Sequence, residues 1–209
     1  MILQNRDREI LKLCLEQQFL LSEHLEPMFS TYKQLRRRVT ELKAQNYIKE
    51  DERGLLTKKN LIRLTHKGKT IALESGAINV SYLKNISPNL ITHDALVTSV
   101  RLRLQGFWNA KFIPERAIQM EGVCPLPDGL FAFPTGKVIA LEVENSDKGK
   151  TRFLKGLERW NTQSSLFFIL YVCSNPTLEL VVRHYLSLSS VNQPMGVAFR
   201  PPIYYSHFK

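Results

Sequence analysis

The stretch PDGLFAFPTGKVIALEVE, residues 127–144, decides the fold of the second half of this chain. Apolar residues on either side of the sequence Pro-Thr-Gly-Lys predict two short strands, and that sequence itself predicts the turn between them. Asp128 precedes the first strand, whereas Glu142 and Glu144 lie two residues apart on the second and therefore point to the same face. We expect these three carboxylates to meet at one end of a sheet, where they would repel one another without a cation or a basic neighbour.

Helices and strands also follow one another around this stretch. Thr92 is placed to cap a helix, and Gly106 to end it. Pro114 should confine its strand to a sheet edge or a bulge. The expected elements are, in chain order, a helix at residues 93–105, strands at 111–120, 129–133 and 138–144, a helix at 147–161, a strand at 165–173, a helix opened by Asn175 and Pro176, and a strand in the C-terminal tail.

The order helix, three strands, helix, strand resembles the core of the PD-(D/E)xK nuclease superfamily, with Pro-Asp at the second strand and Glu-x-Glu on the third. This resemblance implies an α/β three-layer domain with an αβββαβ core and a mixed sheet. It also implies that Asp128 and Glu142 bind a divalent metal, Mg²⁺ or Mn²⁺, which activates water for attack on a phosphodiester. The catalytic residues of an active domain would be Asp128, Glu142, Glu144 and Lys148.

Glu144 departs from that pattern, because the family usually has a lysine at this position. Another lysine could substitute for it, and the candidates are Lys137, Lys148, Lys150 and Lys155. Catalysis therefore stays open, and a domain that only binds DNA or dimerises is our first hypothesis. A simpler alternative is that one carboxylate pairs with Arg116 or a lysine while another faces solvent.

The first 76 residues predict helices around a short hairpin. We expect a helix at residues 6–17, a short helix capped by Ser22, a helix at 31–43 with Thr31 as its cap, strands on either side of a polar tip, and a last helix capped by Thr65. The helix at 31–43 should bury Tyr32, Leu35, Val39 and Leu42. Its other face carries, against Glu41 alone, the basic residues Lys33, Arg36, Arg37, Arg38 and Lys43.

These elements resemble the winged helix-turn-helix fold, both in residues 35–52 and in the sequence IRLTHKG at 62–68, which is similar to the family's L-T-x-x-G signature. The resemblance implies that residues 31–43 form a recognition helix for the DNA major groove and that Lys58 and Lys59 lie at the wing tip, near the DNA backbone. Two alternatives are an ordinary solvated helix face and a protein-interaction surface.

Four short motifs together resemble the replication-relaxation family, namely THDALV at 92–97, PER at 114–116, PDG at 127–129 and LEVE at 141–144. This resemblance implies a DNA-binding protein of a plasmid, a conjugative element or other mobile bacterial DNA, acting in replication, transfer or transcriptional control. We therefore predict an α+β protein with a winged helix domain at 1–76, a linker at 77–90 and a PD-(D/E)xK-like domain at 91–209. Its alternative function is a Mg²⁺- or Mn²⁺-dependent DNA endonuclease targeted by the winged helix.

Composition agrees with a nucleic-acid partner. The 209 residues carry a formal net charge of +10, which favours polyanions, and double-stranded DNA is the expected partner. No run approaches the ~18 apolar residues of a membrane-spanning helix, and no secretory signal is evident, so we expect a cytoplasmic protein without a membrane partner. No phosphate-binding loop suggests a nucleotide cofactor. A homodimer stays open, because a palindromic DNA site would require one.

Overall fold

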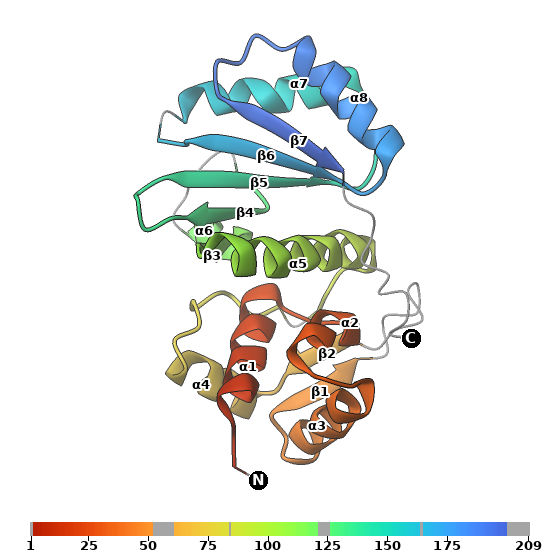
Figure 1. Cartoon of the computed structure of the whole chain (residues 1–209), viewed down its shortest axis with the longest axis vertical. Coiled ribbons are helices and arrows are strands. Elements are labelled where there is room, and N and C mark those ends of the chain that lie inside the picture. Colours follow the sequence, from red (N-terminus) through yellow and green to blue (C-terminus); the bar gives the residue numbers. More distant parts are fainter. Residues whose placement is uncertain (1, 52–60, 84, 121–125, 164, 200–209) are drawn as a thin grey trace. The chain divides into compact units, whose positions relative to one another are not determined.

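The computed structural model describes residues 2–51, 61–83, 85–120, 126–163 and 165–199 (Figure 1). Contacts between Cα atoms divide the chain into two compact units, Met1–Thr98 and Ser99–Lys209, here called the first and second unit. Helices and two sheets together confirm the predicted α+β class. Among the described helices, none is both long and apolar enough to cross a membrane.

The first unit consists of helices around a two-stranded hairpin, in the order that the sequence predicted. Its strands are antiparallel, with Ile48 opposite Leu64 and Asp51 opposite Leu61. The elements are α1 (Asn5–Gln17), α2 (Ser22–Leu25), the 3₁₀ helix η1 (Glu26–Met28), α3 (Tyr32–Ala44), β1 (Ile48–Asp51), β2 (Leu61–Leu64), α4 (His66–Glu74) and the beginning of α5 (Pro88–Trp108).

Threonine side chains cap two helices of the first unit, α3 and α4. The hydroxyl oxygen of Thr31 accepts the amide N–H of Gln34 at 3.2 Å, so Thr31 caps α3 as predicted. The predicted cap at Ser22 is wrong, because Ser22 is already the first residue of α2. Here Nδ1 of the buried His24 accepts the amide N–H of Leu21 at 3.1 Å, and its Nε2 lies 3.1 Å from the carbonyl oxygen of Ala95, to which it donates.

The L-T-x-x-G sequence has a physical explanation in the junction between the hairpin and α4. The Thr65 hydroxyl accepts the amide N–H of Gly68 at 3.1 Å, which caps α4, and donates to the carbonyl oxygen of Asn46 at 2.6 Å. A Cβ atom at Gly68 would lie 2.0 Å from the carbonyl oxygen of Tyr47. Only glycine therefore allows α4 to pack against the backbone that enters β1.

Residues 77–83, which we expected to be part of a linker, pack onto the first unit. The amide N–H of Ile78 donates to Glu16 at 2.9 Å, and that of Leu83 donates to Gln18 at 2.7 Å. Buried Arg63 of β2 donates to the carbonyl oxygen of Leu83. Backbone groups in this segment thus find partners on α1 and β2, which the polar composition of the segment did not indicate.

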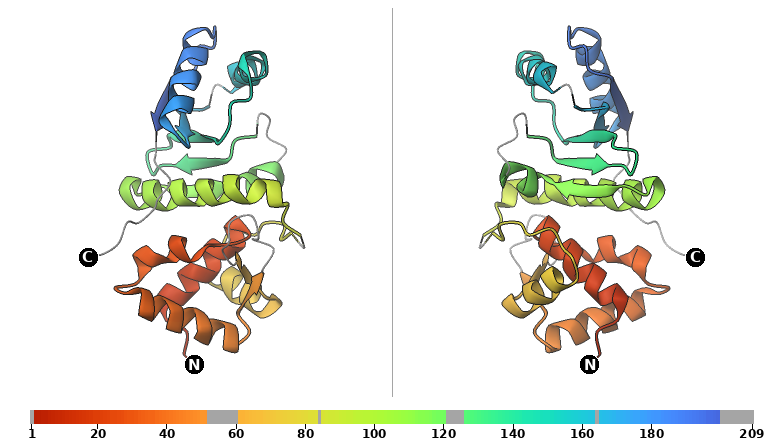
Figure 2. Two further views of the ribbon diagram at one scale, coloured as in Figure 1. Left: turned by 90° about the vertical axis from the view of Figure 1, so that its right-hand side faces the viewer. Right: turned by 90° about the vertical axis from the view of Figure 1, so that its left-hand side faces the viewer.

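The second unit is built on a five-stranded mixed sheet of order β3-β4-β5-β6-β7. The pairs β3–β4 and β4–β5 are antiparallel, whereas β5–β6 and β6–β7 are parallel. Figure 2 shows α7 and α8 on one side of this sheet and the last turns of α5 on the other. The elements after α5 are β3 (Lys111–Pro114), α6 (Glu115–Met120), β4 (Gly129–Ala132), β5 (Val138–Glu144), α7 (Lys150–Glu158), the 3₁₀ helix η2 (Arg159–Thr162), β6 (Phe168–Cys173), α8 (Pro176–Ser187) and β7 (Met195–Phe199).

Three expectations about these elements were wrong in detail. Helix α5 begins at Pro88 and continues past Gly106, because proline suits a first turn and one exposed glycine costs a helix only about 1 kcal/mol. Thr92 therefore lies inside α5 rather than at its cap. The strand predicted at 111–120 ends at Pro114, and residues 115–120 form α6. The remaining predicted strands and helices exist, with ends shifted by up to three residues.

We predict that Gly68→Ala lowers the free energy of unfolding by on the order of 2–3 kcal/mol, because the new methyl group meets a backbone oxygen that cannot move alone. Gly106→Ala is the matched control, since a Cβ at Gly106 has no neighbour within 4 Å. That change should raise the stability by roughly 0.5–1 kcal/mol through helix propensity. Urea denaturation of the two variants measures both effects, and similar values for the two would contradict this account of the junction.

Candidate nucleic-acid interface and carboxylate cluster

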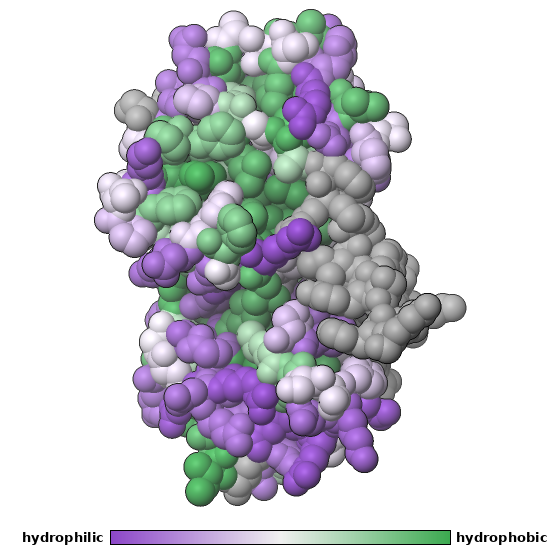
Figure 3. All heavy atoms as spheres, viewed as in Figure 1, coloured by the Kyte–Doolittle hydropathy of each residue, from purple (hydrophilic) through white to green (hydrophobic). Residues whose placement is uncertain are grey.

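Helix α3 turns a basic face to solvent. Leu35 and Leu42 are buried and Val39 is half-buried, as predicted, but Tyr32 is 58% exposed, so the prediction that it is buried was wrong. The exposed basic side chains follow helical spacing and are called the α3 row; they are Lys33, Arg36, Arg37 and Lys43. Figure 3 shows mainly hydrophilic residues over this part of the first unit.

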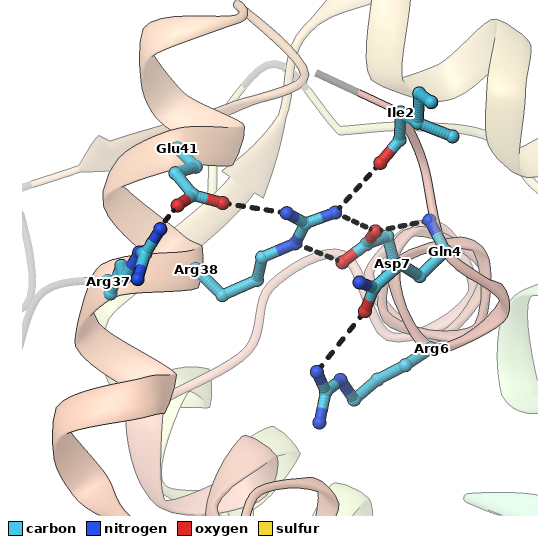
Figure 4. A network of polar contacts seen from close by, with 7 residues as sticks. All are labelled: Ile2, Gln4, Arg6, Asp7, Arg37, Arg38 and Glu41. Carbon is cyan, nitrogen blue, oxygen red and sulfur yellow. Dashed lines mark hydrogen bonds and ion pairs between the residues drawn. The ribbon is translucent and has the colours of Figure 1, made fainter.

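Arg38 does not belong to that exposed row, although the sequence placed it there. Its guanidinium turns toward α1 and forms a two-pronged ion pair with Asp7, whose side chain is fully buried (Figure 4). It also pairs with Glu41 at 2.7 Å and donates to the carbonyl oxygen of Ile2. Only 12% of the Arg38 side chain is exposed. Arg38 therefore fastens α3 to α1 rather than facing a ligand.

Electrostatics around Asp7 favour its charged form. Burial acts to raise the pKa of Asp7, but hydrogen bonds from Arg38 and the Gln4 amide, together with the charges of Arg38 and Arg6, hold that pKa below its ordinary value of 3.8. Hydrogen bonds and the charge of Asp7 in turn raise the pKa of Arg38. The charged pair thus persists throughout the neutral pH range.

Two side chains of the α3 row form ion pairs with carboxylates of the same unit. Arg37 pairs with Glu41 at 2.9 Å and remains 83% exposed, and Lys43 pairs with Glu50 at 2.5 Å. Such exposed pairs contribute about 0–1 kcal/mol, so they can give way to a phosphate partner. A groove of about 920 Å³ along α3 is also lined by Glu23 and Glu26 of α2 and η1, which the sequence did not associate with this helix. Lys58 and Lys59, predicted at the wing tip, lie outside the described residues.

In the second unit, Asp128 fixes the start of β4 against β5. Its carboxylate accepts the amide N–H of Val143 at 2.6 Å, and its own amide N–H donates to the carbonyl oxygen of Leu141 at 3.0 Å. A Cβ atom at the next residue, Gly129, would lie 2.2 Å from the Phe112 ring, which explains the glycine in the Pro-Asp-Gly sequence. One oxygen of the carboxylate that we expected to bind a metal is thus used by the backbone.

Glu144 already has a cation beside it. The Lys148 ammonium lies 2.9 Å from a carboxylate oxygen of Glu144, whose side chain is only 4% exposed. Partial burial acts to lower the pKa of Lys148, but Glu144, Glu142 and Asp128 together raise it above its ordinary value. Burial and the charges of the same three carboxylates raise the pKa of the Tyr171 hydroxyl. All three acids therefore act on the same two side chains, Lys148 and Tyr171.

This arrangement differs from the metal-centred cluster that we expected. Within the ranges that the structure describes, no group of three or more His, Cys, Asp or Glu side chains is placed to hold a metal ion. The pairing of Glu144 with Lys148 instead matches the simpler alternative, in which one acid pairs with a lysine. Among the other candidate lysines, Lys137 lies over the Phe167 ring at 4.0 Å, before the first residue of β5, whereas Glu144 is its last.

Of the basic residues beside the carboxylates, Lys148 and Lys155 were candidates from the sequence, but Arg152 and Arg159 were missed. Four cations, Lys148, Arg152, Lys155 and Arg159, line one cavity of about 480 Å³ together with Glu142 and Glu144. Arg152 and Lys155 lie three residues apart and so on one face of α7, whereas Lys148 precedes that helix and Arg159 begins η2. The signal for the two arginines was present within the helix predicted at 147–161, where both have the spacing of its other basic residues.

Comparison with known proteins identifies no relative for this chain: no family model, no curated protein and no solved structure matches it. The chemistry of both sites is therefore argued from the residues and their geometry.

Substitution of Arg38 by methionine should destabilise the protein by about 3–5 kcal/mol at pH 7, because it leaves the charge of Asp7 buried without its partner. Replacing both residues, as Asp7→Leu with Arg38→Met, should recover most of that loss. Arg37→Met is the matched control on the same helix and should change stability by about 1 kcal/mol or less. Urea denaturation of the three variants measures these differences.

The effect of Arg38→Met should also depend on pH. Because the pKa of Asp7 in the folded protein is below its ordinary value of 3.8, the stabilisation by this pair is present above that value and is lost as the pH falls through the folded-state pKa. In Arg38→Met, burial without the guanidinium makes Asp7 take up a proton at higher pH than in wild type. The difference in stability between the two proteins should therefore be largest near neutral pH, shrink as the pH falls, and be lost once Asp7 is protonated in both. A difference that stays constant down to pH 3 would show that Asp7 is not the group involved.

Proposed function

We propose that this chain is a DNA-binding protein whose first unit is a winged helix domain that contacts duplex DNA through α3. The observation that carries the proposal is the α3 row, which stays exposed while Leu35 and Leu42 anchor the opposite face of the helix. An α-helix fits the major groove, where Arg can contact guanine bidentately and Lys can neutralise phosphate.

Two further features support this proposal. The hairpin of β1 and β2 follows α3 directly, and α4 is fastened to its base by Thr65 and Gly68, which is the arrangement that a wing beside a recognition helix requires. Arg38 holds α3 through a buried ion pair, so the exposed row is presented from a fixed helix. Rigid presentation lowers the entropy that is lost on binding.

For the second unit we propose a PD-(D/E)xK-like domain that serves in binding or dimerisation. The order of α5, three strands, α7 and β6 supports this assignment, although α6 stands between the first two strands. The charges of Asp128, Glu142 and Glu144, which all act on Lys148, support it as well. Together with the motif resemblances, the proposal assigns the chain to replication, transfer or transcriptional control of a plasmid, a conjugative element or other mobile bacterial DNA.

Neutralising the α3 row should weaken DNA binding. The slope of the logarithm of duplex affinity against the logarithm of salt concentration is negative. For Arg36→Gln with Arg37→Gln, we expect this slope to become less negative by about 2, since each phosphate contact contributes roughly 0.9. Fluorescence anisotropy with a labelled 30-base-pair duplex, at several salt concentrations, measures the slope. Arg103→Gln with Lys111→Gln removes the same charge from exposed residues of α5 and β3 and should leave the slope nearly unchanged. Equal slopes for the two double variants would overturn the role of α3.

A second candidate function is a Mg²⁺- or Mn²⁺-dependent endonuclease, favoured by the contact between Lys148 and Glu144, which would provide the lysine that the motif lacks. These carboxylates fit a metal poorly, because one oxygen of Asp128 accepts the backbone N–H of Val143 and one oxygen of Glu144 accepts a hydrogen bond from Lys148. We expect no metal-dependent nicking of supercoiled plasmid DNA, measured by gel electrophoresis with Mn²⁺. Nicking that disappears in Asp128→Asn with Glu142→Gln would establish the endonuclease instead.

A further inference from the structure

The cavity of about 480 Å³ in the second unit is lined by both basic residues and carboxylates. The basic residues of this lining, here called the α7 row, are Lys148, Arg152, Lys155 and Arg159. Arg152 and Lys155 are exposed on α7 itself, and Arg159 begins η2. Because four cations face two carboxylates, the lining has an excess of positive charge and suits an anionic ligand.

Lys148 changes what the carboxylates can do to such a ligand. An unpaired Glu144 would repel a phosphate group that approached the cavity. The ammonium of Lys148 lies 2.9 Å from Glu144 and also experiences the charges of Glu142 and Asp128. It therefore provides, from within the chain, the positive charge that a divalent cation would otherwise bring.

The dimensions of the row suggest an extended ligand. Helix α7 runs from Lys150 to Glu158, which at a rise of 1.5 Å per residue is about 12 Å, and Lys148 and Arg159 lie just beyond its two ends. Over such a length one nucleic acid strand presents several consecutive phosphates. Trp160 and Tyr171 are buried and pack with Phe153 in the core under α7, so the basic side chains project from a fixed support. A solvated helix face would lack this concave setting.

We propose that the α7 row binds the phosphodiester backbone of a nucleic acid strand, with Lys148 neutralising Glu144 so that the phosphates bind without a divalent cation. This site uses residues of the second unit alone, and it rests on the proposed function only in taking nucleic acid as the ligand.

The first test removes charge from the row. In the full chain, Arg152→Gln with Lys155→Gln should weaken binding of labelled single-stranded dT20 in EDTA, and the logarithmic salt slope should fall by about 1.4, because each contact to a single strand contributes roughly 0.7. Arg103→Gln with Lys111→Gln is again the matched control, since it removes the same charge elsewhere. Binding by the α7 variant that equals binding by this control would overturn the proposal.

The second test concerns the cation. Glu144→Gln keeps the size of the side chain but releases Lys148, so binding of dT20 in EDTA should become several-fold tighter. A metal-centred site predicts the opposite, namely loss of binding both in EDTA and in Glu144→Gln. Circular dichroism of each variant confirms that the chain is folded, and Arg152→Gln with Lys155→Gln tests the site even where Glu144→Gln does not fold.

The two nucleic-acid sites can fail separately. If Arg36→Gln with Arg37→Gln leaves duplex binding unchanged while the α7 variant loses dT20 binding, the α3 proposal fails and the α7 site stands. The reverse result removes the α7 site and leaves the function of α3 intact.

Discussion

The ion pair between Asp7 and Arg38 is the interaction on which the first unit depends most. A fully buried carboxylate is tolerated only when it is paired and hydrogen-bonded, and Arg38 does both while contacting Glu41 as well. Because the two residues lie on α1 and α3, the requirement to pair them fixes which side of α3 faces inward. The buried charge of Asp7 thus determines which face of α3 presents the α3 row to solvent.

The second unit also pairs a buried carboxylate with a cation of the same chain. Glu144 is almost fully buried at the end of β5, and Lys148 reaches it from the turn before α7. In both units a cation of the chain satisfies an acid that the fold has removed from water. The difference is exposure, since 41% of the Lys148 side chain stays accessible and only 12% of Arg38 does. Lys148 is therefore accessible to a ligand, whereas Arg38 serves to hold α3 against α1.

Local signals explain why much of the fold could be predicted. Capping residues and apolar spacing located α1, α3, the hairpin and β5 correctly, since these signals act within a few residues. The role of Arg38 could not be predicted, because its partner lies 31 positions away in the sequence and nothing local marks it. For the same reason, the attachment of residues 77–83 to Glu16 and Gln18 was invisible, and a polar segment was interpreted as a linker. The pairing of Glu144 with Lys148 matched one of the alternatives that the sequence left open.

The buried residue His24, at the start of α2, meets a specific hydrogen-bonding requirement. The ring accepts an N–H from Leu21 on one edge and donates to the carbonyl oxygen of Ala95 on the other, which fixes a single neutral tautomer. Among the twenty amino acids, imidazole alone has an acceptor and a donor nitrogen on opposite edges of one rigid five-membered ring. Asparagine could satisfy one edge but not both at this distance. A side chain that lacked either nitrogen would therefore leave one of these two buried backbone groups without its hydrogen bond.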